Sequence, residues 1–257
     1  MENIVFEIKN GLATIQLNRP DKFNSFIRQM ALDFQACLDD CQSANVRAVL
    51  ITGTGKAFCA GQDLKEVMAA PKDGLIRIVG EHYNPIVRKI RALEKPVIAA
   101  VNGVAAGAGA NLAFACDIVL AHEKTSFIQA FSKIGLIPDT GGTYTLPRLL
   151  GYHKALALMM TGDKLSAQEG KDLGVVYKIF SDEEFLEGTR AFAQKLSEMP
   201  TYALGKTKMM LQQSMHQTMD QQLDIERDEQ FKASQTHDYT EGVTAFIEKR
   251  KADFKGN

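Results

Sequence analysis

Along the first forty residues, apolar and polar positions alternate with the period of a strand and then with that of a helix. The stretch IVFEIKNGLATIQLN holds two short alternating runs on either side of Asn10-Gly11, a dipeptide that strongly favours a β-hairpin. Beyond it, Ser25 is a suitable N-cap for a helix that we expect to run to about Asp40. The apolar face of this helix would consist of Phe26, Met30, Phe34, Cys37 and Cys41.

Continuous apolar runs then replace the alternating ones. RAVLITGTG and KPVIAAVNG both end in glycine, as is typical of strands covered on both faces, and a helical pattern from 74 to 93 lies between them. CDIVLAH repeats the strand signal after a short helix rich in glycine and alanine, and VVYKIF indicates a last strand near residue 177. From residue 182 onward the pattern is helical almost to the end. This order predicts an α/β fold with βαβ crossovers and a helical C-terminal quarter.

The composition limits the class of protein. The chain of 257 residues has 45% hydrophobic and 24% charged residues and a formal net charge of -1. These values indicate one enzyme-sized globular unit, without the charge that would attract nucleic acid or a membrane surface. The four cysteines have neither C-x-x-C spacing nor partnered histidines, so a metal site and a disulfide framework are both disfavoured. The N-terminus lacks an apolar leader and no stretch is apolar enough to span a bilayer, so we expect a cytoplasmic protein.

Two glycine-containing stretches look like nucleotide-binding motifs but lack their spacing. TGTGKAF does not have the P-loop spacing, and Lys56 is followed by Ala57 rather than by a hydroxyl side chain. In GAGANL, Leu112 occupies the third glycine position of a dinucleotide motif. We therefore expect no nucleotide cofactor and no metal.

Three glycine-punctuated turns follow apolar strands and are the candidates for chemistry: AFCAGQDLKE, NGVAAGAGANLAFACD and GLIPDTGGTYTLPRLLG. Glycine lets the backbone approach a ligand closely, and N–H groups at the start of a helix favour negative charge. Two such N–H groups converging on one oxygen would form an oxyanion hole. In the third turn, Asp139 is a carboxylate in a mainly apolar run, and it is either a turn residue or an acid that moves protons.

These turns, together with LNRPDKFNS, TGDKLSAQEGKDLGVV and the final AFIEKRKADF, resemble the crotonase superfamily of enoyl-CoA hydratases and isomerases along nearly the whole chain. The resemblance implies a crotonase-like spiral of ββα units over residues 1–195. It implies a C-terminal helical region, residues 196–257, that builds a homotrimer or a dimer of trimers. The substrate implied is an acyl-CoA thioester, so coenzyme A arrives as part of the substrate and not as a separate cofactor.

The resemblance also implies roles in binding. The backbone N–H groups of Gln62 and Ala108 correspond to an oxyanion hole for the thioester carbonyl, with Ala108 standing where glycine is commoner. The residues that correspond to the coenzyme A path are Lys22, Asn24, Ala60, Gln62, Asp63 and Leu64, and also Phe246 and Lys249, which would reach a nucleotide held by a neighbouring subunit.

Departures from the family pattern bear on the reaction. Hydratases of the family use two glutamates on opposite sides of a water molecule, and their positions here hold Asn111 and Phe131, which we assign to the acyl pocket. Neither side chain can exchange a proton, so efficient hydration is disfavoured. Asp139 stands where isomerases carry their single carboxylate. GLIPDTGG and FCAGQDL are similar to the ring-1,2-epoxyphenylacetyl-CoA isomerase branch.

The resemblance thus implies an acyl-CoA isomerase with Asp139 as its sole acid/base. It would shift the double bond of a 3-enoyl-CoA or rearrange a ring epoxide such as 1,2-epoxyphenylacetyl-CoA. Two alternatives remain open, an enoyl-CoA hydratase in which Asp139 activates water and a non-catalytic acyl-CoA-binding protein. Plainer roles are also open for single residues: Asp139 as a turn residue, Asn111 as a packed amide, and Lys249 as part of a solvated chain end.

Overall fold

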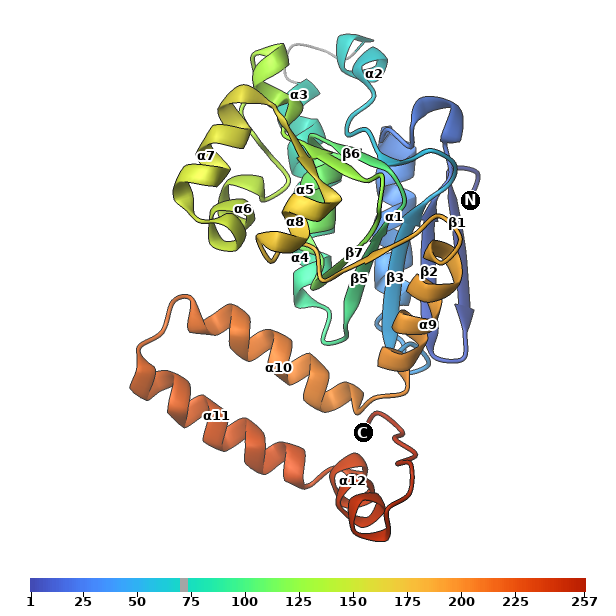
Figure 1. The fold of residues 1–257 in the computed structure, drawn as a ribbon, viewed down its shortest axis with the longest axis vertical. Helices are drawn as coiled ribbons and strands as arrows, with labels where there is room; N and C mark the ends of the chain where they lie inside the picture. The colour runs from blue at the N-terminus through green and yellow to red at the C-terminus, as the bar shows by residue number, and fades with distance from the viewer. Residues whose placement is uncertain (70–73) are drawn as a thin grey trace.

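The computed structural model describes residues 1–69 and 74–257, and its ribbon shows a core of strands and helices with α10, α11 and α12 extending below it (Figure 1). The strands are β1 (Ile4–Lys9), β2 (Leu12–Leu17), β3 (Ala48–Gly53), β4 (Ala57–Cys59), β5 (Val97–Val101), β6 (Val104–Ala106), β7 (Ile118–His122), β8 (Ser126–Ile128), β9 (Lys164–Ser166) and β10 (Lys178–Phe180).

The α-helices are α1 (Arg28–Asp40), α2 (Leu64–Ala69), α3 (Gly74–Arg77), α4 (Asn84–Ala92), α5 (Ala108–Ala115), α6 (Gly142–Leu150), α7 (Tyr152–Thr161), α8 (Ala167–Asp172), α9 (Phe185–Ser197), α10 (Thr201–Ser214), α11 (Met219–Ser234) and α12 (His237–Glu248). Shorter helical turns are η1 (Pro20–Lys22), the π-helical η2 (Ile78–Tyr83) and η3 (Ala130–Ile134).

The larger sheet has the strand order β1-β2-β3-β5-β7-β10. β1 and β2 form the predicted antiparallel hairpin, and Asn10 and Gly11 both have positive φ, as a two-residue type I′ turn requires. From β2 to β10 the neighbouring strands run parallel. All residues of β5 are buried, which explains why its sequence is apolar without interruption.

A second sheet has the order β4-β6-β8-β9 and consists of strands of only three residues, too short for the sequence pattern to indicate. β4 follows β3, β6 follows β5 and β8 follows β7, and a helical segment comes after each pair. This repeat of two strands and a helix is the predicted ββα spiral. The turns from β4 to α2 and from β6 to α5 carry the site described below.

Helices cover both faces of the larger sheet. On one face, Val49 and Ile51 of β3 belong to the main apolar cluster, which also includes buried residues of α1, α4 and α5. On the other face, Leu50 packs in a smaller cluster with Phe185 and Ala193 of α9. Because successive side chains of β3 point to opposite faces of the sheet, this strand contributes to two separate cores. The arrangement is therefore α/β/α.

The helix predicted to follow Ser25 begins later than expected. α1 starts at Arg28, and Ser25 is not its N-cap. The intervening Phe26 pairs with Gln62 in an isolated parallel bridge, which keeps this part of the backbone extended. The Arg28 N–H is instead accepted by a carboxylate oxygen of Glu66 at 2.9 Å.

The predicted helix from 74 to 93 contains a wider turn. In η2 the chain adopts π-helical geometry, and the N–H of Asn84 donates to the carbonyl of Val79, five residues earlier. Pro85 follows directly, and a proline ring clashes with the carbonyl four residues before it in a regular α-helix. The wider register avoids this clash, so the π-turn has a local cause in the sequence.

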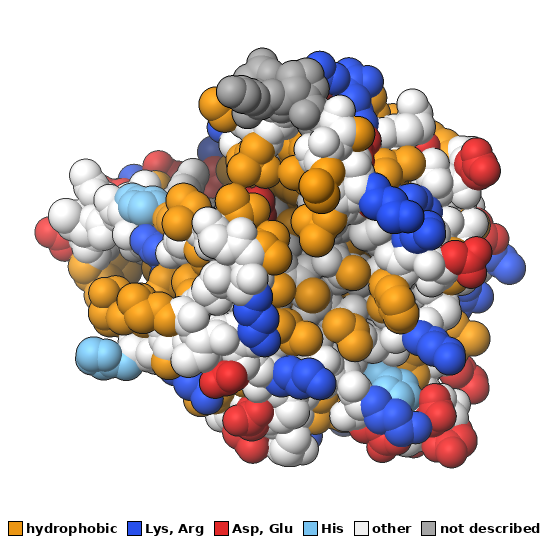
Figure 2. All heavy atoms as spheres, turned by 90° about the horizontal axis from the view of Figure 1, so that it is seen from above, with side chains coloured by type: hydrophobic (Ala, Val, Ile, Leu, Met, Phe, Trp, Pro, Cys, Tyr) orange, Lys and Arg blue, Asp and Glu red, His pale blue; other side chains and the backbone are white. Residues whose placement is uncertain are grey.

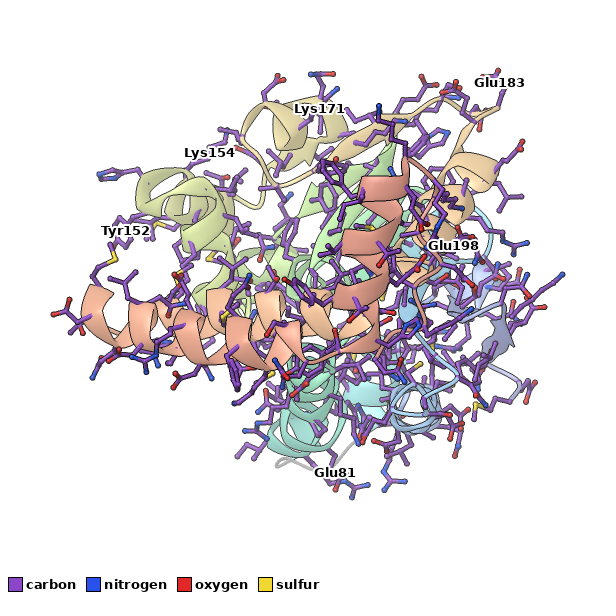
Figure 3. All side chains as sticks on the ribbon, turned by 90° about the horizontal axis from the view of Figure 1, so that it is seen from below. Glu81, Tyr152, Lys154, Lys171, Glu183 and Glu198 are labelled. Atoms are coloured by element: carbon purple, nitrogen blue, oxygen red, sulfur yellow. The ribbon has the colours of Figure 1, made fainter. Side chains whose placement is uncertain are left out.

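The last three helices are attached to the core by a few polar anchors. Lys208 of α10 donates to the carbonyl of Ile90 at 2.7 Å and pairs with Asp117 at 2.9 Å. Seen from below, α11 lies lengthwise and α12 stands across it, with Glu198 near α12 (Figure 3). Glu198 pairs with Lys251 at 3.1 Å.

Among the described helices, each is too short or too polar to cross a bilayer.

Candidate active site

A cavity of about 540 Å³ opens between the turn after β4, the start of α5 and the segment that leads into α6. Its walls are mostly apolar, and its size is within the range of small-molecule sites. The lining residues used below are Lys22, Ala60, Gly61, Gln62, Asp63, Leu64, Tyr83, Gly107, Ala108, Phe131 and Asp139. From above, hydrophobic side chains gather in the middle of this face of the molecule, with lysine and arginine side chains around them (Figure 2).

The predicted oxyanion donors, the N–H groups of Gln62 and Ala108, belong to residues that line the same cavity. The two backbone segments are neighbours, because a Cβ on Gly61 would come within 3.4 Å of the Ala108 nitrogen. Gly61 and Gly107 precede the donors and have φ of +88 and +53, conformations that glycine adopts without strain. Within the described residues neither donor N–H has a protein acceptor, which leaves both free for a ligand oxygen.

Each of these two backbone segments is fixed by contacts with its surroundings. On the Gln62 side, the Phe26 N–H donates to the carbonyl of Gly61 at 2.7 Å, and the Asp63 N–H donates to the carbonyl of Phe26 at 2.9 Å. On the α5 side, a Cβ on Gly109 would lie 2.2 Å from the carbonyl oxygen of Cys59. Only glycine allows α5 to approach β4 this closely, so the GAG segment serves packing as well as a donor role.

Cys59 lies next to the site without taking part in its chemistry. Its side chain is fully buried, and burial raises the pKa of the thiol to about 12. Its sulfur accepts a hydrogen bond from the Gly61 N–H at 3.4 Å. The thiol therefore stays protonated at neutral pH and acts as a small core side chain.

Asp139 presents the carboxylate that is best suited to proton transfer. Burial raises the pKa of its carboxyl above the usual value, while a hydrogen bond donated by the Thr140 hydroxyl, at 2.7 Å, opposes this rise. Partial burial alone would also raise the pKa of Asp63, but its pairing with Arg19 at 3.1 Å holds that pKa below the usual value. Asp21, a third lining carboxylate, is exposed. Among the described lining residues, Asp139 is thus the carboxylate that is sheltered and unpaired with a cation.

The turn that carries Asp139 has an unusual backbone. Thr140 and Gly141 both have positive φ, +54 and +74. The carbonyl oxygen of Asp139 accepts two hydrogen bonds of 2.9 Å, one from the N–H of Gly142 and one from Nδ2 of Asn111. The turn hydrogen bond to Gly142 agrees with the plainer interpretation of Asp139, and the cavity-lining carboxylate agrees with the catalytic one.

The two residues assigned to the acyl pocket lie in different places. Phe131 lines the cavity, with its ring next to Gly107. Asn111 is fully buried and is not among the described lining residues. Its amide lies between Nε2 of Gln129, which donates to Oδ1 at 2.8 Å, and the carbonyl of Asp139. Asn111 is therefore a packed amide behind the turn that carries Asp139.

Five of the predicted coenzyme A residues, Lys22, Ala60, Gln62, Asp63 and Leu64, line the cavity. Asn24 is not among the described lining residues. It is fully buried, its Oδ1 accepts from the N–H of Arg19 at 2.8 Å, and its Nδ2 donates to the carbonyls of Thr54 and Ala57 at 2.9 and 2.8 Å. The side-chain amide of Asn24 thus makes its hydrogen bonds to backbone groups of neighbouring turns.

Phe246 and Lys249 lie at the end of α12 and are not among the described residues that line this cavity. Phe246 is 86% exposed, and Lys249 ends the helix with φ of +54. Their assignment to the nucleotide of a neighbouring subunit stays a prediction.

Tyr83 is a lining residue to which the sequence analysis assigned no role. It is buried, and its hydroxyl donates to Oε1 of Gln62 at 3.0 Å, while Nε2 of Gln62 donates to Glu66 at 2.7 Å. Burial raises the pKa of Tyr83 well above its usual value, so the phenol is neutral. Tyr83 is the last residue of the π-helical turn η2, and Pro85 was the sequence signal for that turn. Irregular helical turns often occur at functional sites, so this signal could have pointed to Tyr83.

Comparisons with known proteins agree with this geometry. Residues 7–257 match the family model described as enoyl-CoA hydratase/isomerase. The chain is 43% identical to the 1,2-epoxyphenylacetyl-CoA isomerase of Escherichia coli, over 100% of this chain and 99% of that protein. It is 35% identical to the trans-2-decenoyl-acyl-carrier-protein isomerase of Streptococcus mutans, over 99% and 98% of the two chains. The crystal structure of an enoyl-CoA hydratase from Bacillus anthracis matches with a TM-score of 0.94 and 33% identity, over 99% of this chain and 100% of that one.

The fold and the site thus define an enzyme of the acyl-CoA class. The chain belongs to the enoyl-CoA hydratase/isomerase family, the crotonase superfamily, as the sequence motifs predicted. Its relatives include isomerases and hydratases, so membership shows an enzyme of this family but does not decide between the two reactions. The particular reaction has to be argued from the residues of the site.

Proposed function

We propose that this protein is an acyl-CoA isomerase that works through an enolate-like thioester intermediate. Asp139 is its sole acid/base, and the N–H groups of Gln62 and Ala108 bind the thioester oxygen. The observation that carries the proposal is that, among the described residues, one sheltered, unpaired carboxylate and both free N–H donors line the same apolar cavity.

The residues divide the reaction between them in a simple way. The carboxylate of Asp139 removes a proton from carbon 2 of a 3-enoyl thioester, and the electron pair moves onto the thioester oxygen. The two N–H donors stabilise this developing charge, an interaction worth roughly 3 to 4 kcal/mol per donor in other enzymes. Asp139 then returns the proton at carbon 4, so the double bond moves and no water is consumed. Burial raises the pKa of Asp139, which makes it a stronger base than an exposed carboxylate.

Two substrates fit this proposal, 1,2-epoxyphenylacetyl-CoA and a 3-enoyl-CoA. The relative with 43% identity is named for the first of them. The described walls of the cavity include Leu75, Ile78, Phe131 and Leu136, which suit an aromatic ring as well as an unsaturated chain. With the ring epoxide, the same donors would stabilise charge while the epoxide opens and rearranges to an oxepin.

The coenzyme A part of the substrate is assigned to the mouth of the cavity. Lys22 supplies a cation there, and the backbone from Ala60 to Leu64 passes along the same opening. Phe246 and Lys249 complete the nucleotide site of a neighbouring copy in a homotrimer or a dimer of trimers. Exposed apolar side chains on α10 to α12 support this assembly, since large exposed apolar surfaces mark interfaces.

The test is to supply the purified protein separately with a 3-enoyl-CoA, a 2-enoyl-CoA and 1,2-epoxyphenylacetyl-CoA. The reactions are run in water enriched in heavy oxygen, and the products are separated by chromatography and analysed for incorporated oxygen. Water addition incorporates the heavy oxygen and double-bond migration does not, so the two reactions are counted separately. We expect isomerised product without incorporated oxygen, from the 3-enoyl substrate, from the epoxide or from both.

Two other outcomes would refute the proposal. Faster incorporation of oxygen into 2-enoyl-CoA would make the protein a hydratase, the activity for which the Bacillus anthracis relative is named. Binding of all three thioesters without turnover would make it a non-catalytic acyl-CoA-binding protein.

A further inference from the structure

Two buried amides form a short chain that ends on the backbone of Asp139. Nε2 of Gln129 donates to Oδ1 of Asn111 at 2.8 Å, and Nδ2 of Asn111 donates to the carbonyl of Asp139 at 2.9 Å. Asn111 is 0% and Gln129 is 3% exposed, so neither amide can exchange these partners for bulk water. Losing a partner would leave a buried polar group unsatisfied, which is unfavourable.

The order of donors fixes how the Asn111 amide is turned. A backbone carbonyl only accepts hydrogen bonds, so the nitrogen of Asn111 must face Asp139 and its oxygen must face away. The group on that other side is the donor Nε2 of Gln129. Gln129 therefore stabilises the orientation in which Asn111 donates to the carbonyl of Asp139.

The turn requires such support because its backbone is strained. Thr140 directly follows Asp139, has a φ of +54 and is 1% exposed. A β-branched residue in the left-handed region is strained and persists only where the surroundings enforce it. The two hydrogen bonds onto the Asp139 carbonyl, from Gly142 and Asn111, are local interactions that enforce it.

The start of α6 also rests on the same amide. A Cβ on Gly142 would lie 2.2 Å from Nδ2 of Asn111, so the backbone of Gly142 packs directly on this side chain. Asn111 belongs to α5, whose first residue is the oxyanion donor Ala108. One amide therefore ties the helix that begins with a donor to the turn that carries the base.

We propose that Asn111, oriented by Gln129, is a positioning residue that holds Asp139 at its working position relative to the oxyanion donors. The inference rests on the proposed function of Asp139 and extends it. Asn111 does not touch the substrate in this arrangement, because it lies behind the turn and is not among the described lining residues. Its loss should reduce the rate of proton transfer and leave substrate binding unchanged.

The experiment compares Asn111→Leu with Gln129→Met, two substitutions that keep approximate size and remove the amide. We expect kcat for isomerisation to fall roughly tenfold to a hundredfold in Asn111→Leu, since a small misplacement of a reacting group has effects of this size. KM should stay within about twofold. Gln129→Met should lower kcat less. The double variant should be no slower than Asn111→Leu, because Gln129 acts through Asn111.

Asn102→Leu is the matched control. The amide of Asn102 also joins two loops, with Oδ1 accepting from Gly53 at 3.1 Å and Nδ2 donating to Gly55 at 2.8 Å, but it does not contact the Asp139 turn. We expect this variant to lose stability in urea unfolding while its kcat stays within about twofold. Equal losses of kcat in Asn102→Leu and Asn111→Leu would overturn the proposal, because they would show a general effect of loosening the fold.

Two further results would also overturn it: an Asn111→Leu enzyme with unchanged kcat, or one in which only KM rises. If Asn111→Leu does not fold, Gln129→Met decides alone, and an unchanged kcat in that variant refutes the positioning role. Asp139→Asn separates this inference from the proposed function. If Asp139→Asn is inactive and Asn111→Leu is fully active, only the positioning role fails. If Asp139→Asn keeps its turnover, the proposed function fails as well.

Discussion

At the scale of single residues, the Thr140 hydroxyl adjusts the basicity of Asp139. Burial raises the pKa of Asp139, and the hydrogen bond from Thr140 Oγ1, at 2.7 Å, lowers it. In the proposed mechanism Asp139 acts as a base when deprotonated, so we expect kcat/KM to rise with pH through this pKa and then to level off. The acidic limb of the profile should therefore lie above the ordinary aspartate value of 3.8.

Thr140→Val keeps the branched shape of the side chain and removes the hydroxyl. We expect the acidic limb of kcat/KM to move to higher pH by about one unit, since a hydrogen bond to a charged group is worth about 1.5 to 3 kcal/mol. Thr140→Ser keeps the hydroxyl and is the control, with a limb close to that of the wild type. A Thr140→Val limb at the wild-type position would show that this hydroxyl does not set the pKa.

At the scale of elements, the close contact between α5 and β4 positions the two N–H groups of the proposed oxyanion hole. Gly109→Ala would place a methyl group 2.2 Å from the carbonyl oxygen of Cys59, a backbone atom that cannot move alone. We expect a loss of about 1 to 3 kcal/mol in the free energy of unfolding and a fall in kcat of at least about tenfold, because α5 carries the Ala108 donor. Urea unfolding and steady-state kinetics measure the two effects.

Gly80→Ala is the control for this substitution, because a Cβ on Gly80 meets nothing within 4 Å and its φ is not in the left-handed region. It should leave kcat unchanged and stability equal or slightly higher. If Gly109→Ala behaves as Gly80→Ala does, close packing of α5 does not hold the donor in place.

The ion pair between Lys208 and Asp117 connects α10 to the core, and it leads to a pH-dependent prediction. Burial raises the pKa of Asp117, and the ammonium of Lys208 at 2.9 Å counteracts that rise. Lys208→Met leaves the ionised carboxylate of Asp117, whose side chain is 22% exposed, without its partner, so we expect a loss of about 1 to 3 kcal/mol in unfolding free energy at pH 7. The loss should shrink as pH falls through the raised pKa, because protonated Asp117 needs no cation.

Urea unfolding at pH 7 and at pH 5, at fixed protein concentration, checks this prediction. Adding Asp117→Asn to Lys208→Met should recover much of the stability at pH 7. A loss that is the same at both pH values would indicate that Lys208 contributes packing and hydrogen bonds rather than charge.

At the scale of the whole molecule, the C-terminal helices carry a series of exposed large apolar side chains. The exposed large apolar residues on α10 to α12 and the loops between them include Leu211, Met215, Met219, Leu223, Phe231, Phe246 and Ile247. We expect analytical ultracentrifugation to give three or six times the mass of one chain, and Leu223→Glu with Phe231→Glu to dissociate the assembly. A wild-type protein that sediments as one chain at micromolar concentration would contradict the proposed trimer.

The sequence predicted most of this molecule where one local signal sufficed. Asn10-Gly11 predicted the hairpin, and the apolar runs predicted the parallel strands β3, β5 and β7. Contacts between distant segments could not be predicted in this way. The strands of the second sheet are too short to carry a period, and the extended backbone at Phe26 depends on its partner Gln62.

The same distinction applies to the site. The motifs brought Asp139, Gln62, Ala108 and Phe131 correctly to one cavity. The motifs did not predict that the buried amide of Asn111 donates to the backbone carbonyl of Asp139 instead of lining the pocket. Residue type alone does not fix the direction of a side chain.

The most direct test of the account is the activity of Asp139→Asn with a 3-enoyl-CoA. The substitution keeps the size of the side chain and removes its ability to take up a proton. We predict that the rate of double-bond migration falls by about 10² to 10⁴, the usual contribution of a general base, while the Kd for a non-isomerisable acyl-CoA changes less than twofold. Migration at a rate close to that of the wild type would contradict the central claim, because the proton would then be moved by another group.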